Sequence, residues 1–170
     1  MKNLTLRKPT AEDGAAVHRL IAACPPLDTN SAYCNLIQCT HFANTSVIAE
    51  VAGQPVGFIS GHRVPDRPNT LFVWQVAVGE QGRGQGLAGR MLSHIVARPA
   101  NEWIEQLETT VTEDNAASWA LFEGFARRRG AALSTQVLFD REAHFEGAHA
   151  SEILARIGPL ARADLRAVAH

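Results

Sequence analysis

The sequence contains little cysteine, with three residues at positions 24, 34 and 39 and no C-x-x-C spacing. An odd number of unclustered cysteines argues against a disulfide framework and against a zinc knuckle, so we expect reduced and mostly buried thiols. The seven histidines form no H-E-x-x-H pattern. The sequence therefore predicts no metal site.

Long apolar runs are also absent. No stretch approaches the roughly 18 apolar residues that a membrane-spanning helix needs, and the start, MKNLTLRKPTAEDG, lacks the apolar core of an export signal. We therefore expect a cytoplasmic protein without a membrane partner. A net charge of −1 supplies no field to gather nucleic acid either.

The composition that is present is that of an ordinary globular protein. Hydrophobic residues make up 46% and charged residues 19% of 170 residues, without repeats, low-complexity segments or an evident linker. This length is enough for one domain with a proper core, so residues 1–170 are predicted to form a single domain.

The apolar pattern predicts strands and helices in alternation. Strands are expected at residues 4–7, twice within 45–64 around a turn at 53–54, at 70–78 after a turn at 66–69, at 106–112, and at 134–139. Helices are expected from Thr10, with Asp13 completing an approximate capping box, and at residues 31–42, 87–97 and 114–125. In the last helix, Asn115 or Asp114 lies near the N-cap and Gly124 near the end.

The most unusual segment is the glycine-rich stretch VAVGEQGRGQGLAGRML at residues 76–92. Residues 84–89 match the dinucleotide fingerprint G-x-G-x-x-G, and Glu108 stands near the position of its ribose-binding acid. A dinucleotide fold, however, places the first glycine almost directly after the first strand and adds further βα units. Here residues 79–81 intervene, an antiparallel meander precedes the loop, and too little chain follows.

The loop has two other interpretations. The Walker loop requires G-K-[ST], but the chain has Gly89-Arg90-Met91. A plain packing turn stays open as an alternative. The favoured interpretation is that glycines direct backbone N–H groups inward at a helix N-terminus, where these donors and the helix dipole hold a diphosphate, with Arg83 adding a charge-assisted contact.

At this loop the chain resembles the Gcn5-related N-acetyltransferase (GNAT) family. Gln81, Gly84 and Gly86 match that family's [QR]-x-x-G-x-[GA] motif, and DNAASWALFEGF at 114–125 resembles its following helix motif with a compressed end. The resemblance implies an α+β fold, with a mixed, mostly antiparallel central sheet flanked by helices on both faces, and acetyl-CoA as co-substrate.

The resemblance also assigns residues to the cofactor. They are Val76, Val78, Gln81, Gly82, Arg83, Gly84, Gln85, Gly86, Leu87, Asn115, Ser118 and Phe122. A backbone N–H near Val76 is implied to face the thioester oxygen. Many members carry at the position of Phe122 a tyrosine that protonates the departing thiolate, which phenylalanine cannot do. The proton donor is therefore unassigned, with Tyr33 or water as alternatives.

Two further segments resemble one group within that family, the L-2,4-diaminobutyrate N-acetyltransferases. PPLDTNSAY at residues 25–33 matches their P-P-L-D-x-N-S-x-Y stretch, and His149 and Glu152 form an H-x-x-E pair that would share one face of a helix. The implied reaction is direct acetyl transfer, in a ternary complex, to the 4-amino group of a small diamino acid in ectoine biosynthesis. A homodimer is also implied.

The chemistry of that reaction suggests catalytic and substrate-binding residues. An aliphatic ammonium with a pKa near 10 must lose a proton before it attacks, so Glu152 or His149 is the candidate base, with Glu152 preferred because a carboxylate also attracts the cation. The remaining candidates for the substrate site are Asp28 for the α-ammonium, Thr29, Asn30 and Ser31 for the carboxylate, and Tyr33 and Trp74 as aromatic contacts.

Each assignment has a plainer alternative. Asp28 could form only an Asx turn, Tyr33 and Trp74 could be core aromatics, and His149 and Glu152 could be a solvated pair. At the level of function, the alternatives are an acetyltransferase for another small amine or a peptide N-terminus, and a non-catalytic module that senses acyl-CoA. The sensing module stays an alternative because of Phe122, which cannot protonate the departing thiolate.

Overall fold

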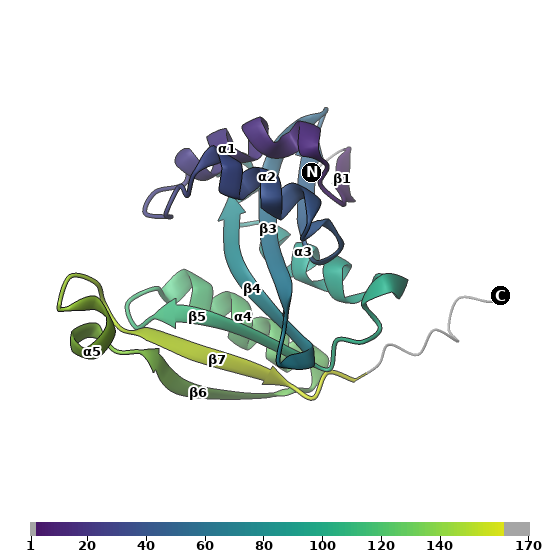
Figure 1. Ribbon diagram of the computed structural model, residues 1–170. Coiled ribbons are helices and arrows are strands. Elements are labelled where there is room, and N and C mark those ends of the chain that lie inside the picture. Colours follow the sequence, from purple (N-terminus) through teal and green to yellow (C-terminus); the bar gives the residue numbers. More distant parts are fainter. Residues whose placement is uncertain (1–2, 162–170) are drawn as a thin grey trace.

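The computed structural model describes residues 3–161, and within them seven strands form one sheet in the order β1-β2-β3-β4-β5-β7-β6 (Figure 1). The strands are β1 Leu4–Arg7, β2 Val47–Val51, β3 Gln54–Val64, β4 Arg67–Val78, β5 Gln106–Thr112, β6 Ala132–Phe139 and β7 Glu152–Gly158. Neighbouring strands are antiparallel except β4 and β5, which are parallel. The predicted mixed, mostly antiparallel sheet is confirmed.

Helices cover both faces of this sheet. They are α1 Gly14–Ala22, α2 Ala32–Thr40, α3 Leu87–Val96, α4 Ala116–Arg129 and the short α5 Arg141–Phe145, with 3-10 turns η1 Ala11–Asp13, η2 Ala43–Thr45, η3 Glu80–Gly82 and η4 Pro99–Asn101. Helices α1 and α2 pack on one face and α3 and α4 on the other. No helix within residues 3–161 is long and apolar enough to cross a membrane.

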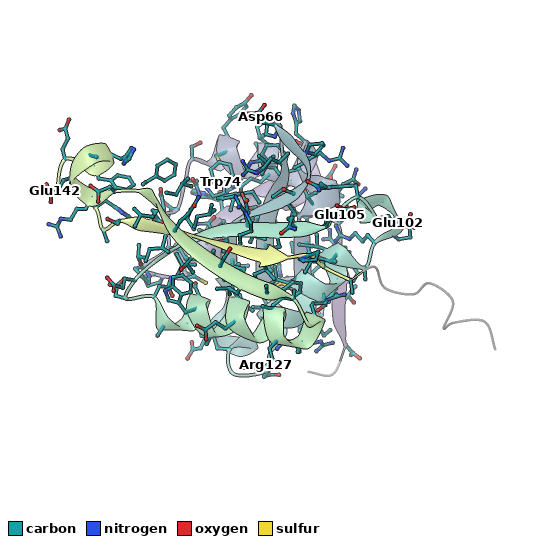
Figure 2. The ribbon with its side chains drawn as sticks, turned by 90° about the horizontal axis from the view of Figure 1, so that it is seen from below. Asp66, Trp74, Glu102, Glu105, Arg127 and Glu142 are labelled. Carbon is teal, nitrogen blue, oxygen red and sulfur yellow. The ribbon has the colours of Figure 1, made fainter. Side chains whose placement is uncertain are left out.

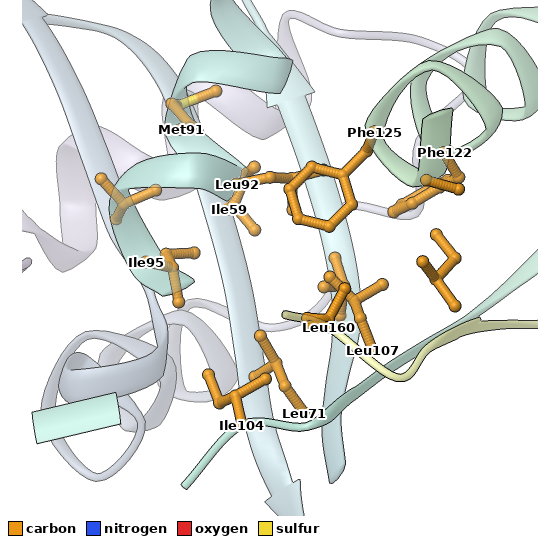
Figure 3. Packing of buried hydrophobic residues seen from close by; sticks show 14 of the residues in the cluster. Ile59, Leu71, Met91, Leu92, Ile95, Ile104, Leu107, Phe122, Phe125 and Leu160 are labelled. Atoms are coloured by element: carbon orange, nitrogen blue, oxygen red, sulfur yellow. The ribbon is translucent and has the colours of Figure 1, made fainter. Parts of the chain in front are cut away.

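Two buried clusters hold the helices against the sheet. The larger joins Leu92 and Ile95 of α3 and Phe122 and Phe125 of α4 to strand residues such as Leu107 (Figure 3). The smaller joins α1 and α2 to the other face of β2, β3 and β4. Because each fully buried apolar side chain contributes about 1.5–3 kcal/mol, these clusters fix the helices firmly beside β4.

The ends of the helices agree with some of the predicted boundary signals and differ from others. Thr10 and Asp13 form the predicted capping box, and the Asn115 side chain accepts a hydrogen bond from the N–H of Ser118 at 3.1 Å as the N-cap of α4. The prediction that Gly124 lies near the end of that helix is wrong. Helix α4 continues to Arg129 and ends at Gly130, which has a φ of +60°, because buried side chains continue the apolar face of the helix beyond Gly124.

The predictions for the tail also need correction. Only one strand was expected after Arg127, but β6 and β7 are both present, and Glu152 begins β7 rather than sharing a helix face with His149. Strand β7 pairs with β5 on one side and β6 on the other, so backbone pairing on both edges overrides the three-residue spacing. The sequence after the expected strand at 134–139 also predicts a polar, partly helical end, and part of it falls on residues 162–170, outside the described residues.

The feature that creates a site is the divergence of β4 from β5. The two strands pair only from Thr70 to Val73 of β4. Beyond that point both strands continue, but they are no longer hydrogen-bonded to each other. At the same level the β3–β4 ladder is irregular, because Ser60 pairs with Gln75 and Gly61 with Val73. Trp74 is thus the extra residue of a β-bulge, which bends β4 away from β5 and opens the sheet.

Candidate functional site

The backbone of β4 faces the opening between the two strands. The Gly79 N–H donates to the Val56 carbonyl at 2.9 Å. Because hydrogen-bonded and non-hydrogen-bonded pairs alternate along an antiparallel ladder, Val78 opposite Gly57 and Val76 opposite Ile59 are non-hydrogen-bonded pairs. The N–H and C=O groups of Val76 and Val78 therefore point away from β3, towards the side that β5 has left.

A glycine turn leads from the end of β4 into α3. Gly84 has a φ of +71° and Gly86, the N-cap of α3, a φ of +66°. Glycine adopts this left-handed conformation without strain, whereas a branched side chain does not. The first N–H groups of α3 have no carbonyl partner inside the helix, and together with the helix dipole they form an anion-binding end.

A groove of about 1130 Å³ runs from β4 over the glycine turn to α3 and α4. Its lining includes Val76, Val78, Gly82, Arg83, Gly84, Gly86, Leu87 and Ser118, which were assigned to the cofactor from the sequence, and also Leu6, Ala88, Gly89, Arg90, Ser93, His94, Ala97, Ala117, Ala120, Leu121 and Arg128. The second set was missed. The helical spacing of Arg90, Ser93 and Ala97, which are three and four residues apart, was the available signal.

Four of the residues assigned to the cofactor do not line this groove. Gln85 donates from its amide to the Gln81 carbonyl at 2.9 Å, which braces the glycine turn. Asn115 caps α4, and Phe122 is 2% exposed within the larger core cluster (Figure 3). The structure thus places Phe122 in the core.

The electrostatics of the groove suit a polyanion. Arg83, Arg90 and Arg128 line it, and the described lining residues include no carboxylate. Burial, and then the charge of Arg98, lower the pKa of His94 below its ordinary value, so the arginines carry the positive charge near neutral pH. A groove with backbone donors, a helix N-terminus and arginines fits the phosphates of CoA.

On the other face of the sheet, the segment after the double proline is fastened to β4. The Gln75 amide donates to the Asp28 carbonyl at 2.6 Å, and the Asn30 amide donates to Gln75 Oε1 at 3.3 Å. Sequence reasoning did not single out Gln75, although a polar residue within the apolar strand FVWQVAV was a usable signal. Its bonds hold residues 28–30 beside Trp74.

The residues predicted for the substrate are only partly free to bind it. Asp28 Oδ1 accepts from the Asn30 N–H at 3.0 Å, which is the Asx turn that was the alternative for Asp28. Ser31 Oγ accepts from the Cys34 N–H at 3.1 Å as the N-cap of α2. The other carboxylate oxygen of Asp28, the Thr29 hydroxyl and the hydroxyl proton of Ser31 have no partner among residues 3–161.

The two aromatic candidates are not core residues. Tyr33 is 72% and Trp74 46% exposed, so the core alternative is wrong. Figure 2 shows Trp74 and Arg127, at the end of α4, on opposite sides of the sheet. Trp74 therefore lies on the face that carries residues 28–31, and the groove lies on the other.

The strand registers place Glu152 on the same face as Trp74. Glu152 and Arg156 are four residues apart in β7, so their side chains share a face, and Arg156 is in register with Glu108 and, through it, with Phe72. The His62 ring contacts Phe72 at 5.4 Å and Trp74 at 6.4 Å between centroids, which puts Trp74 on that face as well. Glu152 thus lies on the same face of the sheet as Trp74.

His149 and His62 differ in environment. His149 lies in the loop before β7, with Nδ1 2.7 Å from the Ala150 carbonyl and its ring 4.8 Å from that of Phe145. His62 was given no role from the sequence, but its ring lies against Trp74. Burial lowers the pKa of His62, so a neutral ring supports the indole.

No three His, Cys, Asp or Glu side chains within the described part of the chain are grouped so that they could hold a metal ion. What the arrangement can do is bind a nucleotide-bearing thioester on one face and present it, through the opening beside β4, to a cationic molecule on the other. The residues on the second face supply a carboxylate at Asp28, a second at Glu152 and an aromatic surface at Trp74.

Comparison with known proteins identifies a family and relatives, one of which binds CoA and a diamino acid. The Acetyltransferase (GNAT) family profile matches residues 15–126. An L-2,4-diaminobutyric acid acetyltransferase of Methylotuvimicrobium alcaliphilum is 57% identical over 156 residues, covering 92% of this chain and 91% of the relative. The diaminobutyrate acetyltransferase of Paenibacillus lautus, solved with L-2,4-diaminobutyric acid and coenzyme A, superposes with a TM-score of 0.87 at 40% identity, covering 92% of this chain and 95% of that one. The ribosomal-protein-S18-alanine N-acetyltransferase of Escherichia coli, at 15% identity and a TM-score of 0.68, shares the fold, with coverage of 95% and 97%.

Proposed function

This chain belongs to the acetyltransferase (GNAT) family, and we propose that it transfers the acetyl group of acetyl-CoA to the 4-amino group of L-2,4-diaminobutyrate. The observation that carries the proposal is the opening beside β4, where Val76 and Val78 face a cationic groove on one side and Asp28, Trp74 and Glu152 share the other. The identity to relatives of that activity over nearly the whole chain supports the choice of substrate.

The co-substrate supplies an acetyl group activated as a thioester. The N–H groups of the glycine turn and of the first turn of α3, with Arg83, are placed to hold its diphosphate. The backbone N–H and C=O of Val76 and the N–H of Val78, which point away from β3, would bind the pantetheine arm, while the Val78 carbonyl accepts hydrogen bonds from Arg83 Nε at 3.1 Å and Cys24 Sγ at 3.5 Å. A Val76 N–H directed at the thioester oxygen would stabilise the negative charge that develops there during attack.

On the amine side, the residues must produce a free amine and orient it. Glu152 takes the proton from the 4-ammonium group, after which the nitrogen bonds to the carbonyl carbon and the carbon–sulfur bond breaks. Asp28 pairs with the α-ammonium, and Trp74 forms a cation–π surface beside it. Tyr33, exposed on the same segment, or water then protonates the departing thiolate, whose thiol has an ordinary pKa near 8.5.

The proposal is tested by measuring thiol release from acetyl-CoA. L-2,4-diaminobutyrate should be the preferred acceptor over ornithine, lysine, 2,3-diaminopropionate and peptides, and mass spectrometry should place the acetyl group on the 4-nitrogen. Preference for a longer diamine or a peptide would instead identify an acetyltransferase for another amine. Tight CoA binding with no release from any amine would identify the sensing module.

Arg128 provides a prediction about the nucleotide end of the groove. Its guanidinium lies on the surface of α3, since a Cβ on Gly89 would come within 2.7 Å of Arg128 Nη2. If it contacts the 3′-phosphate, Arg128→Gln should weaken binding of CoA about three- to fivefold, as expected for an exposed ion pair, and leave 3′-dephospho-CoA unaffected. Calorimetry with both ligands measures this, and Arg127→Gln is the neighbouring control. Equal losses for both ligands would contradict the assignment.

We further propose that residues 1–170 are a single acetyltransferase domain that works in the cytoplasm as a homodimer. Its product would feed ectoine biosynthesis and osmoprotection. Strand β6 supports the dimer, because it is an edge strand with exposed Val137 and Phe139, and such an edge suits pairing with a second copy. Light scattering after size exclusion would give the mass in solution, and a monomer would contradict this part.

A further inference from the structure

One buried carboxylate has no part in the mechanism described so far. The Glu108 side chain is 1% exposed and bridges two arginines, with Oε2 at 2.5 Å from Arg67 Nη2 and Oε1 at 2.7 Å from Arg156 Nε. A buried carboxylate needs such partners, and one guanidinium would neutralise it. The second leaves the Glu108 cluster, defined as Arg67, Glu108 and Arg156, with a net charge of +1.

The Glu108 cluster lies on the face of the sheet that carries the amine site. Phe72, Glu108 and Arg156 form one row across β4, β5 and β7, and the His62 ring connects Phe72 with Trp74. At about 3.3 Å per residue, the Cα atoms of Glu152 and Arg156 are about 13 Å apart along β7. A long arginine side chain and a four-carbon amino acid together span such a distance.

The two arginines retain unused hydrogen-bond donors. The Arg156 side chain is 43% exposed and uses only Nε on Glu108, while that of Arg67 is 48% exposed and uses only Nη2. Their other guanidinium nitrogens have no partner among residues 3–161. Because Glu108 fixes each guanidinium at one nitrogen, the remaining donors are held in place for a second anion.

The α-carboxylate of the proposed substrate needs a positively charged partner, and residues 28–31 do not supply one. The Asn30 amide is engaged by Gln75, the Ser31 oxygen accepts a backbone N–H, and Asp28 is itself acidic. Hydroxyl groups can donate hydrogen bonds to a carboxylate, but they do not compensate its charge. A guanidinium does both, with a planar fork that matches a carboxylate.

We propose that Arg156, fixed by Glu108, binds the α-carboxylate of the amino acid substrate and so makes the enzyme select a diamino acid over a plain diamine. This inference rests on the proposed function, because it assigns a contact to the same substrate. Arg67 supports Arg156 by sharing the charge of Glu108. The cluster thus acts on specificity and takes no part in proton transfer.

The test compares two acceptors that differ only in the carboxylate, L-2,4-diaminobutyrate and 1,3-diaminopropane. The wild-type enzyme should favour diaminobutyrate in kcat/KM. In Arg156→Gln this preference should fall about tenfold or more, through the KM for diaminobutyrate, as expected for the loss of a charge-assisted contact. The KM for acetyl-CoA should not change. Arg156→Lys, which keeps the charge but loses the fork, should retain part of the preference.

Controls separate the inference from loss of folding and from failure of the proposed function. Glu108 keeps Arg67 in the Arg156→Gln variant, so thermal unfolding should show a folded protein. Arg63→Gln, whose arginine lies over Trp103 on the opposite face, should keep the wild-type preference. An Arg156→Gln enzyme with unchanged preference overturns the inference alone. A wild-type enzyme that acetylates neither compound overturns the proposed function.

Discussion

Replacing Gly84 with valine should weaken CoA binding about 100-fold, because the loss of two charge-assisted hydrogen bonds of about 1.5 kcal/mol each corresponds to that factor. Gly84 has a φ of +71°, which a β-branched residue does not tolerate, so the turn would relax and its N–H groups would no longer converge. A Cβ at this position meets no protein atom within 4 Å, so its methyl groups would stand in the space that a diphosphate needs. Isothermal titration calorimetry with CoA measures the change.

Gly53→Val is the matched control for this experiment. Gly53 has a φ of +74°, no atom lies within 4 Å of its hypothetical Cβ, and it belongs to the β2–β3 turn rather than to the groove. Both variants should therefore lose a similar amount of stability, while only the Gly84 variant should lose CoA affinity. Equal affinity in the two variants would refute the glycine turn as the diphosphate site.

Replacing Glu152 with glutamine should lower turnover by about 100-fold at pH 7, a typical effect of removing a general base. Without the carboxylate, the reaction depends on amine that has already lost its proton, and this fraction rises about tenfold per pH unit below a pKa near 10. The deficit of the variant should therefore shrink as the pH rises. The measurement is kcat/KM for diaminobutyrate from pH 6 to pH 10.

Replacing Glu152 should leave the fold unchanged, because its carboxylate forms no hydrogen bond or ion pair within residues 3–161. Glu142→Gln is a suitable control, since this glutamate is exposed on α5 and its one ion pair in the described part of the chain is with Arg141. Its turnover should match the wild type at every pH. Parallel pH profiles for wild type and Glu152→Gln would mean that another group accepts the proton, and His149 would be the next candidate.

The geometry of the groove that we propose for CoA could be predicted in large part from the sequence, because its signals are local. Positive φ values at Gly84 and Gly86 and the capping bond of Asn115 depend on residues close together in the chain. Phe122 shows the limit of the same approach. Its motif position indicated the cofactor, but burial of a large apolar ring at a helix–sheet contact placed it in the core.

The amine side depends on contacts that sequence spacing does not reveal. Glu152 and His149 are three residues apart, which suggested a helix, but pairing of β7 with both β5 and β6 decided otherwise. Gln75 and Asp28 are distant in the chain and meet only after folding. Glu108 looked like a ribose-binding acid, yet its two arginine partners come from β4 and β7 and could not be identified before the strand order was known.

The bulge at Trp74 has a consequence for the order of events in a catalytic cycle. It leaves the Val76 and Val78 backbone groups without a neighbouring strand, so a ligand that binds along them fills the gap and completes the wall between the two faces. Before the thioester binds, a diamino acid on the Trp74 side has no electrophile to attack, and its site is open towards the other face of the sheet. We therefore expect compulsory-order kinetics, in which the thioester enters first and the free thiol leaves last.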